Sequence, residues 1–437
     1  MQLTEQHIID QSDPRFAAID AAAFASKNLY NAALYVMRQT FVHEGKRLSY
    51  TQMDKLMKQH EAYKAIPAKV AQQILMQLAN DWESFFQACA AYKENPSKFR
   101  GHPRLPKYKD KAKGRNLLVY TAQAISGGRS KHGLKDGIIK PSGLTLTVKT
   151  QQKYINQVRM VPRSGFYVIE VVYEHEQPKS TVDLANFAGI DIGIDTLAAL
   201  TSNQPGFVPV LVNGRPLKSI NQFYNKRRAE LQSKLGRTGR TARMERLTNT
   251  RNRRIEHYLH TASRWIIDDL VAHGIGTLII GKNDGWKQEA NMGKRTNQNF
   301  VSIPHARFIS MLTYKAELVG IQVMVTEESY TSKASFLDRD AMPVYTPDRT
   351  EKPKFSGKRI ERGLYRAANG KLINADCNGS LNIIRKVAPD AFGSEGVEDG
   401  KGDSPVVHPV RLSFPSRSRK TSNGGNSKQS RARSISL

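Results

Sequence analysis

The sequence predicts a two-part protein, in which an α/β domain follows a small β-barrel that is interrupted by a helical segment. Three observations predict this arrangement. Short strand-like segments separated by turn residues occupy the N-terminus and residues 116–176. Apolar residues recur at helical spacing in residues 16–41 and 70–92. From about Asn186 onward, apolar strands alternate with helical segments, which is typical of a mixed or parallel sheet.

The barrel and its insertion are separated by changes in composition. The two helical segments contain neither Gly nor Pro. At Phe99 the chain changes to a mixture of Pro, Gly and basic residues, which cannot form a helix interior. We therefore expect residues 1–14 and 99–182 to build the barrel, and residues 15–98 to form a helical insertion in it.

The α/β domain is expected to cover residues 183–392. Its predicted elements, in order, are a buried strand with a Gly-containing turn at 187–202, a strand at 208–214, a basic helical insertion at 216–272, a strand at 277–281, a helix near 305–320, a strand at 321–330 and a helix at 374–389. Residues 393–437 are rich in Gly, Ser, Pro and basic side chains, and predict a basic disordered tail.

Net charge indicates the class of partner. The 437 residues include 67 Lys and Arg against 39 Asp and Glu, a net charge of +28. Such an excess favours binding to a polyanion, and nucleic acid is the first candidate. A membrane surface is less favoured, because the sequence has no long apolar run. The N-terminus lacks the apolar region of a secretion signal, and two cysteines are too few for a disulfide framework. These features predict a cytoplasmic, nucleoid-associated protein.

The sharpest chemical motif is Gly-Ile-Asp-Ile-Gly, with Asp191 at its centre. A carboxylate in a buried apolar strand is unfavourable unless it is paired or binds a metal. Actin-like ATPases and RuvC-like nucleases both use such a carboxylate, and a simple turn cap is the structural alternative.

A second motif, Asn-Ala-Asp-Cys-Asn-Gly, places Asp376 at the start of the last helix. Alone it is compatible with helix capping, with Asn378 supporting the aspartate. Together with Asp191, it suggests a metal-dependent phosphodiesterase. Such chemistry requires three or four oxygen ligands that hold two Mg²⁺ ions about 4 Å apart.

The chain resembles the TnpB (OrfB-type) proteins, transposon-encoded relatives of type V CRISPR effectors. The matching pieces are FRGHPRLPK at 99–107, GIDIG at 189–193, NKRRAELQSKL and HTAS in the basic segment, YTSK at 330–333 and NADCNGSLNI from 374. The resemblance implies an RNase H-like (RuvC) nuclease domain, and a wedge-type barrel with a helical recognition insertion. It also implies a guide RNA from the transposon end, and cleavage of double-stranded DNA beside a short adjacent motif.

One departure from the family concerns the third carboxylate. Most members carry a catalytic Glu where this chain has Gly281. Glu327 and Glu328 end the next strand, and strand alternation lets only one of them face the site. We predict Glu328, because family variants with a relocated Glu resemble this arrangement, and Asp284 is the reserve candidate. The alternative for the Glu pair is an exposed acidic turn. The predicted catalytic and metal-binding set is therefore Asp191, Glu328 and Asp376, with Mg²⁺ as the cofactor.

A second departure is the missing zinc ribbon. Between the YTSK motif and the last helix the sequence has no Cys and no His, so we expect no zinc there. This basic stretch is either a DNA contact or a flexible connector.

Basic side chains are predicted to contact nucleic acid through phosphates, and Tyr108 is predicted to stack on a base. The predicted residues are Arg100, Arg104, Lys107, Tyr108, Lys109, Lys226, Arg227, Arg228, Arg251, Arg253, Arg254 and Lys333.

Three functional hypotheses follow. The first is an RNA-guided endonuclease in which one protein binds one guide RNA and a double-stranded target. The second is a nuclease-inactive RNA-guided DNA-binding protein, a repressor or recruiter, which Gly281 motivates. The third is a structure-selective junction resolvase without a guide, which the barrel, the insertion and the charge disfavour.

Overall fold

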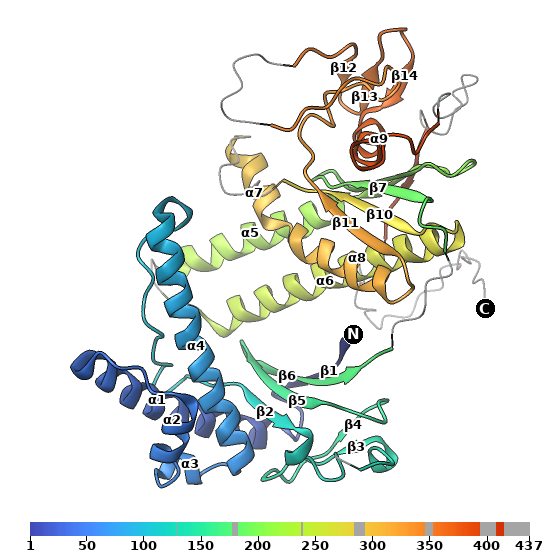
Figure 1. Cartoon of the computed structure of the whole chain (residues 1–437). Coiled ribbons are helices and arrows are strands. Elements are labelled where there is room, and N and C mark those ends of the chain that lie inside the picture. Colours follow the sequence, from blue (N-terminus) through green and yellow to red (C-terminus); the bar gives the residue numbers. More distant parts are fainter. Residues whose placement is uncertain are drawn as a thin grey trace. The chain divides into compact units, whose positions relative to one another are not determined.

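The structure, a computed structural model, describes residues 1–128, 130–176, 182–236, 239–283, 293–345, 353–393 and 408–414. The chain divides into two compact units, Met1–Glu176 and Gln177–Leu437 (Figure 1). The reserve candidate Asp284 and most of the expected tail lie outside the described residues. Among the residues that are described, no helix is both long enough and apolar enough to cross a membrane.

The helices of the first unit form where apolar residues recur at helical spacing. Helix α1 (Phe16–Glu44) ends at Gly45, which has a φ of +67° and closes the helix in the left-handed conformation. Helix α4 (Ala68–Glu94) packs on α1, and Trp82 is fully buried with its ring centroid 5.2 Å from that of Phe41. The helices predicted at 16–41 and 70–92 are confirmed. Between them lie two short helices that were not predicted, α2 (Tyr50–Met57) and α3 (Glu61–Lys64).

The strands of the first unit form a four-stranded sheet in the order β1-β6-β5-β2 and a separate pair, β3-β4. Their bounds are β1 Gln2–Asp10, β2 Leu118–Thr121, β3 Ile138–Ile139, β4 Val148–Lys149, β5 Gln157–Arg163 and β6 Phe166–Glu174, with single turns of 3₁₀ helix at Pro96–Lys98, Ala122–Ala124 and Lys135–Gly137. Helices α1 to α4 lie between β1 and β2 in the chain. In the described part of this unit, the outer strands β1 and β2 do not pair with each other, so the wedge-type barrel stays a prediction.

The second unit is built on a six-stranded mixed sheet in the order β11-β10-β7-β8-β9-β15. Strands β7, β8 and β9 are antiparallel neighbours, whereas β10 runs parallel to both β7 and β11. The predicted mixed sheet is therefore confirmed. The bounds are β7 Phe187–Asp191, β8 Thr196–Ser202, β9 Val210–Asn213, β10 Thr277–Gly281, β11 Gln322–Thr326 and β15 Val410–Leu412.

Helices cover both faces of this sheet. The basic insertion forms two long helices, α5 (Arg215–Leu235) and α6 (Ala242–Ala272), and α6 packs with α8 (His305–Glu317) on one face. Helix α9 (Ala375–Val387) covers the other face, where Cys377 and Leu381 pack against strand residues (Figure 1). A further helix, α7 (Lys294–Ser302), precedes α8.

The stretch without a zinc ribbon is partly ordered as a small antiparallel sheet in the order β12-β13-β14. Its strands are β12 Lys358–Glu361, β13 Leu364–Arg366 and β14 Leu372–Asn374. Tyr365 is buried, and its hydroxyl donates a hydrogen bond to the Lys333 carbonyl at 2.8 Å. The idea of a merely flexible connector is therefore wrong for residues 358–374.

The expectation of a disordered tail over 393–437 is wrong at strand β15, which pairs in parallel with β9. Average composition misled the prediction, because the surrounding residues are polar and basic whereas this strand places Leu412 toward the core. Leu412 and Phe414 pack against the apolar cluster under α6 and α8. Tertiary packing therefore orders a segment whose composition alone predicts disorder.

Candidate active site

The candidate site lies at one edge of the second unit's sheet, where three parallel strands end. Asp191 is the last residue of β7, and Gly281 is the last residue of the neighbouring β10. Gly281 pairs with Thr326, the last residue of β11, and Glu328 follows two residues later. Since parallel strands present their carboxyl ends at the same edge, β7 and the end of β11 bring Asp191 and Glu328 to one place.

Helix α9 brings Asp376 to the same edge. The Asn374 side chain caps the helix by accepting hydrogen bonds from the backbone N–H groups of Asp376 and Cys377, at 3.0 and 3.2 Å. Because Asn374 does the capping, the Asp376 carboxylate is available to the site. Its Oδ2 accepts a hydrogen bond from Thr196 Oγ1 of β8 at 2.7 Å.

Two glycines allow α9 to lie close to β7. A Cβ on Gly379 would stand 2.6 Å from Oδ2 of Asp191, and a Cβ on Gly189 would stand 2.5 Å from the Ser380 carbonyl oxygen. A side chain at Gly189 would meet the backbone of α9, and one at Gly379 would force the Asp191 carboxylate to move. The helix and the strand therefore approach at the point where the two aspartates must meet.

Glu328 and Glu327 face in different directions, as strand alternation predicts. Glu328 Oε2 lies beside Gly281, where an added Cβ would be 2.9 Å from it, and the Glu328 N–H donates to Asn283 Oδ1 at 3.0 Å. Glu327 instead forms an ion pair with Lys386 of α9 and accepts a hydrogen bond from the Ser329 N–H at 2.8 Å. Only Glu328 is directed to the site.

The three carboxylates interact electrostatically. Burial, followed by the nearby charges of Glu328 and Asp376, raises the pKa of Asp191 to about 8, while Arg359 acts in the opposite direction. Burial, followed by the charge of Glu327, raises the pKa of Glu328 to about 7. Asp191 therefore lies between two acidic neighbours, and the negative charge of this cluster is only partly balanced by the protein.

This donor set fits a hard divalent cation. In the described part of the chain, no three His, Cys, Asp or Glu side chains already stand together as a metal-binding group. Asp191, Glu328 and Asp376 nevertheless offer carboxylate oxygens, which are the ligands that Mg²⁺ prefers. Their negative charges repel one another, and a bound cation would offset this repulsion.

Arginines that the sequence did not predict surround the aspartates. A pocket of ≈ 320 Å³ is lined by Asp191 and Asp376, and also by Asp195. Four arginines from three different segments line the same pocket: Arg215, Arg359, Arg362 and Arg411. The sequence contained no signal for them, because they come from the start of α5, the β12–β13 hairpin and strand β15, which only the folded chain brings together.

Two of these arginines make ion pairs inside the pocket. Arg359 Nη2 lies 3.9 Å from Oδ1 of Asp376, and Arg362 pairs with Asp195. Asp195 also binds Lys218 Nζ at 2.5 Å. Asp195 is therefore neutralised by two cations, unlike Asp191.

Comparison with known proteins identifies the relatives of the chain. Residues 170–287 match the OrfB_IS605 family, described as a probable transposase, and residues 305–383 match the Cas12f1-like TNB domain. The chain is 26% identical over 402 residues to the TnpB-like protein ORF457 of Acidianus two-tailed virus, covering 83% of this chain and 81% of that protein.

The chain is therefore similar to TnpB-type proteins and to the type V effectors.

More distant similarities agree with this relationship. The CRISPR-associated endodeoxyribonuclease Cas12f2 of a Micrarchaeota archaeon is 24% identical over 280 residues, which cover 60% of this chain and 48% of that protein, so the match spans about half of that relative. A cryo-EM structure of a Cas12f1–sgRNA–target DNA complex matches with a TM-score of 0.50 at 15% identity, covering 84% of this chain and 82% of the other. This likeness shows that the chain shares the fold of that compact effector.

The role predicted for Asn378 is wrong. Asn378 does not support Asp376. Its Oδ1 accepts from the Phe336 N–H at 2.9 Å, and its Nδ2 donates to the Ala334 carbonyl at 2.8 Å. It therefore holds the segment after the YTSK motif against α9. The sequence could not separate these roles, since both place Asn one turn into the helix.

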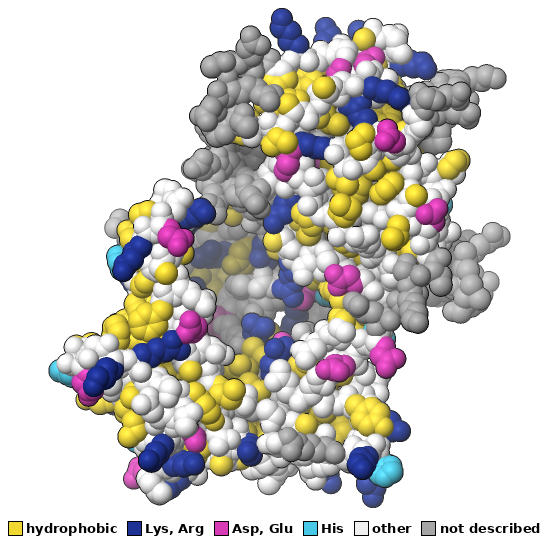
Figure 2. All heavy atoms as spheres, in the orientation of Figure 1, with side chains coloured by type: hydrophobic (Ala, Val, Ile, Leu, Met, Phe, Trp, Pro, Cys, Tyr) yellow, Lys and Arg dark blue, Asp and Glu magenta, His cyan; other side chains and the backbone are white. Residues whose placement is uncertain are grey.

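The basic residues predicted in the second unit fall into two groups. Figure 2 shows Lys and Arg side chains spread over its surface. Exposed side chains occupy α5, α6 and the YTSK segment: Lys226, Arg227, Arg228, Arg253, Arg254 and Lys333. Arg227 also pairs with Glu230 at 2.6 Å. Arg251 is half-buried and donates to Asn221 Oδ1 and the Ser302 carbonyl, both at 2.8 Å, so it ties α6 to α5 and α7.

In the first unit, the basic segment after Phe99 is held along α1 and α4. The Asn31 side chain exchanges two hydrogen bonds with the Lys109 backbone, both 2.9 Å, and the Lys109 ammonium lies 4.6 Å from the centre of the Tyr30 ring. Tyr108 is partly exposed, with the Arg38 guanidinium 5.1 Å from its ring centre. Arg100 is also exposed.

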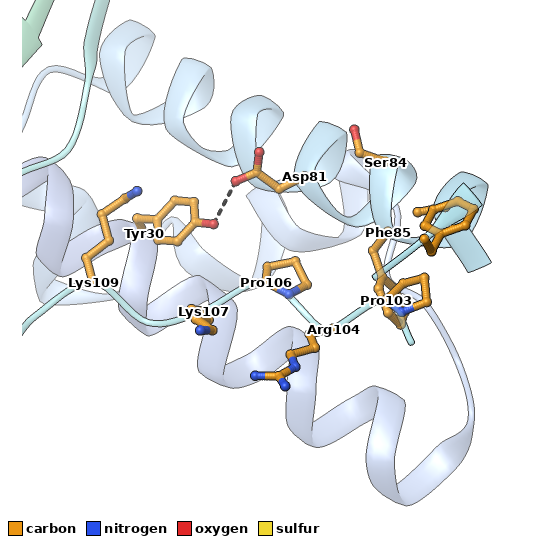
Figure 3. A pocket seen from close by; sticks show the side chains of 11 residues that line it. Tyr30, Asp81, Ser84, Phe85, Pro103, Arg104, Pro106, Lys107 and Lys109 are labelled. Atoms are coloured by element: carbon orange, nitrogen blue, oxygen red, sulfur yellow. Dashed lines mark hydrogen bonds between the residues drawn. The ribbon is translucent and has the colours of Figure 1, made fainter. Parts of the chain in front are cut away.

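Beside this segment lies a pocket of ≈ 550 Å³ that combines aromatic and charged side chains (Figure 3). Arg104, Lys107 and Lys109 line it, and Tyr30 lies beside Lys109 with its hydroxyl donating to Asp81 Oδ2 at 2.7 Å. Aromatic and basic side chains of this kind suit a nucleotide. The predicted contacts of Lys107 and Lys109 with nucleic acid agree with this chemistry.

Proposed function

We propose that this protein is an RNA-guided, Mg²⁺-dependent endonuclease that cleaves double-stranded DNA next to a short transposon-associated motif. One observation carries the proposal: Asp191 lies between Glu328 and Asp376 at one edge of a RuvC-type sheet, and their charges raise its pKa. Relatives described as an endodeoxyribonuclease and as a probable transposase support the same activity.

In this proposal, Asp191, Glu328 and Asp376 would hold Mg²⁺. Bound divalent ions activate a water nucleophile and stabilise the leaving oxygen of the scissile phosphate. The chain's own contribution is to fix the ligands. Thr196 orients Asp376 through a 2.7 Å hydrogen bond, and Lys386 draws Glu327 away so that Glu328 alone faces the site.

Arginines would bind the substrate in the same pocket. Arg359 lies at the edge of the carboxylate cluster, 3.9 Å from Asp376, and Arg362 pairs with Asp195. A guanidinium donates two parallel hydrogen bonds to a phosphate, so these side chains suit a phosphodiester that enters over the aspartates. Their present ion pairs would exchange for substrate contacts.

Guide RNA and target DNA are the proposed partners, with one protein for each guide. The Cas12f1 structure of similar fold is a complex with sgRNA and target DNA. The net charge of +28 and the exposed basic residues of both units suit a large polyanionic partner. The first unit would act as the wedge-type barrel with its recognition insertion, and the second as the nuclease.

The test uses full-length protein purified with its copurifying RNA and a plasmid that carries the matching target. Glu328→Gln removes the proposed ligand, and Glu327→Gln is the matched control, one residue away but paired with Lys386. We expect Mg²⁺-dependent cleavage by the wild type and by Glu327→Gln, and a loss of at least about 100-fold in Glu328→Gln. Equal cleavage by all three would refute the assignment of Glu328. A wild type that binds the guided target and never cuts would instead support the nuclease-inactive alternative.

A further inference from the structure

Strand β15 is anchored firmly to the sheet of the second unit. The Val410 N–H donates to the Pro209 carbonyl at 2.9 Å, and Val410–Leu412 pair in register with β9. Phe414 lies edge-to-face with Tyr258 of α6, with 5.8 Å between the ring centres. The short strand therefore has both backbone and apolar contacts that fix the direction of its side chains.

Register places Arg411 in the same row as the active-site aspartate. Across the sheet, Asp191 pairs with Ala199, Ala199 with Leu211, and Leu211 with Arg411. Residues that pair across neighbouring strands point to the same face of a sheet. Leu211 packs in the apolar cluster on the α9 side, so Arg411 also faces that side.

The pairing across these four strands gives an approximate distance between Arg411 and Asp191. Neighbouring strands lie about 4.8 Å apart, so three steps separate the Cα atoms of Arg411 and Asp191 by roughly 14 Å. Both residues line one pocket, which Asp376 also lines. At this separation Arg411 is too far away to bind the scissile phosphate beside Asp191, but it is well placed for a neighbouring phosphate of the same strand.

Arg411 also differs from Arg359 and Arg362 in its contacts. Arg359 and Arg362 are engaged with Asp376 and Asp195, whereas Arg411 is exposed and forms no ion pair with any residue that the structure describes. Within the described part of the chain, its guanidinium can therefore reach an external anion without breaking an ion pair.

We propose that Arg411 binds a phosphate that flanks the scissile one, and thereby positions the nucleic-acid strand across the active-site pocket. This inference rests on the proposed nuclease function. Strand β15 is then part of the substrate-binding surface. Its position beside β9 sets the distance between the phosphate that Arg411 binds and the carboxylates of the active site.

The experiment compares Arg411→Gln, Arg411→Lys and the control Arg366→Gln, an exposed arginine on β13 outside the pocket. Single-turnover cleavage of a guided duplex target is measured with Mg²⁺, and affinity for the same target with Ca²⁺. We expect Arg411→Gln to cleave about tenfold or more slowly while binding the target as the wild type does, because only the local positioning contact is lost. Arg411→Lys should recover part of the rate, and Arg366→Gln should match the wild type.

A second measurement decides the inference independently of cleavage. The affinity of guide-free protein for a labelled single-stranded DNA oligonucleotide is measured by fluorescence anisotropy over a series of salt concentrations. Loss of one phosphate contact should reduce the slope of log affinity against log salt by about 0.7 in Arg411→Gln and leave it unchanged in Arg366→Gln. If the wild type never cuts, the proposed function fails, and the salt dependence alone then tests whether Arg411 contacts a phosphate. The inference is overturned if Arg411→Gln has the same salt dependence as the wild type. It is also overturned if the wild type cleaves the target and Arg411→Gln cleaves it at the same rate.

Discussion

The carboxylate of Glu328 occupies the space beside Gly281, where an added Cβ would stand 2.9 Å from Oε2 of Glu328. A side chain at the end of β10 would therefore force the Glu328 carboxylate to move from its present position. In this chain the glycine makes room for the glutamate of the neighbouring strand. Gly281 therefore does more than replace the glutamate that most family members carry there, because it leaves the space that Glu328 occupies.

Gly281→Ala should impair both the fold and the site. The new methyl group would lie 2.5 Å from Ile383 Cδ1 and would displace Glu328. We expect a loss of about 1–3 kcal/mol in the free energy of unfolding, as for other overpacked interiors, together with weaker cleavage. Urea denaturation checks the stability. Gly101→Ala is the control, since a Cβ there meets nothing within 4 Å. Equal stability of the two variants would contradict the packing argument.

Asp191→Asn should stabilise the metal-free protein while it abolishes cleavage. The pKa of Asp191 is raised from 3.8 to about 8, so the folded state retains a proton that the unfolded state releases. Wild-type stability therefore falls as the pH rises between these two values, and the variant lacks this loss. We expect a stability gap on the order of a few kcal/mol in favour of the variant at pH 8, and a smaller gap at pH 5. Adding Mg²⁺ should narrow the gap, because it stabilises only the wild type. A pH-independent difference would argue against the carboxylate repulsion.

Lys315 should give the opposite pH dependence. It is buried in α8, where its ammonium donates to the His260 carbonyl and to Ser263 Oγ, both at 2.8 Å. Burial, with a smaller contribution from Arg264, lowers its pKa from 10.5 to about 8. The unfolded state therefore binds more protons between these values, and wild-type stability rises with pH relative to Lys315→Met, by at most about 3 kcal/mol. Thermal unfolding at pH 7.5 and 9.5 measures this, with exposed Lys226→Met as a control that should show no such trend.

Asn374→Ala should weaken the start of α9. The variant loses the side-chain acceptor for the N–H groups of Asp376 and Cys377, which costs about 1 kcal/mol in a typical helix cap. Because Asp376 sits in this first turn, the Mg²⁺ concentration needed for half-maximal cleavage should rise. Asn374→Ser keeps a capping oxygen and should recover most of both properties. Failure of Ser to rescue would mean that Asn374 has a role beyond capping.

The sequence was most informative where local chemistry conflicts with local structure. Asp191 stood out because it lies within an apolar strand. Strand alternation let only one of Glu327 and Glu328 face the site, which the structure reproduces, with Glu328 selected by the family resemblance. The structure gathers the predicted carboxylates at one edge; their catalytic role stays a proposal. The two long helices of the first unit were predictable from spacing alone.

Features that depend on distant parts of the chain were not predictable. Arg411 reaches the pocket only because β15 pairs with β9, far away in sequence, whereas Arg359 reaches it from a local hairpin that lies beside Asp376. Arg251 looked like its exposed neighbours, and only the packing of α5 and α7 explains its buried contacts. Composition also failed at β15, because a three-residue strand is too short to change the average of a polar segment.

The late position of β15 also has a consequence for protein synthesis. Its partner β9 ends at Asn213, and Val410 is the first residue of β15, so the ribosome adds almost two hundred residues between them. Throughout that interval β9 presents an open edge with the apolar side chains Val210, Leu211 and Val212, an arrangement that invites pairing with another chain. Nascent chains on crowded polysomes would therefore be most exposed to aggregation before the last strand emerges.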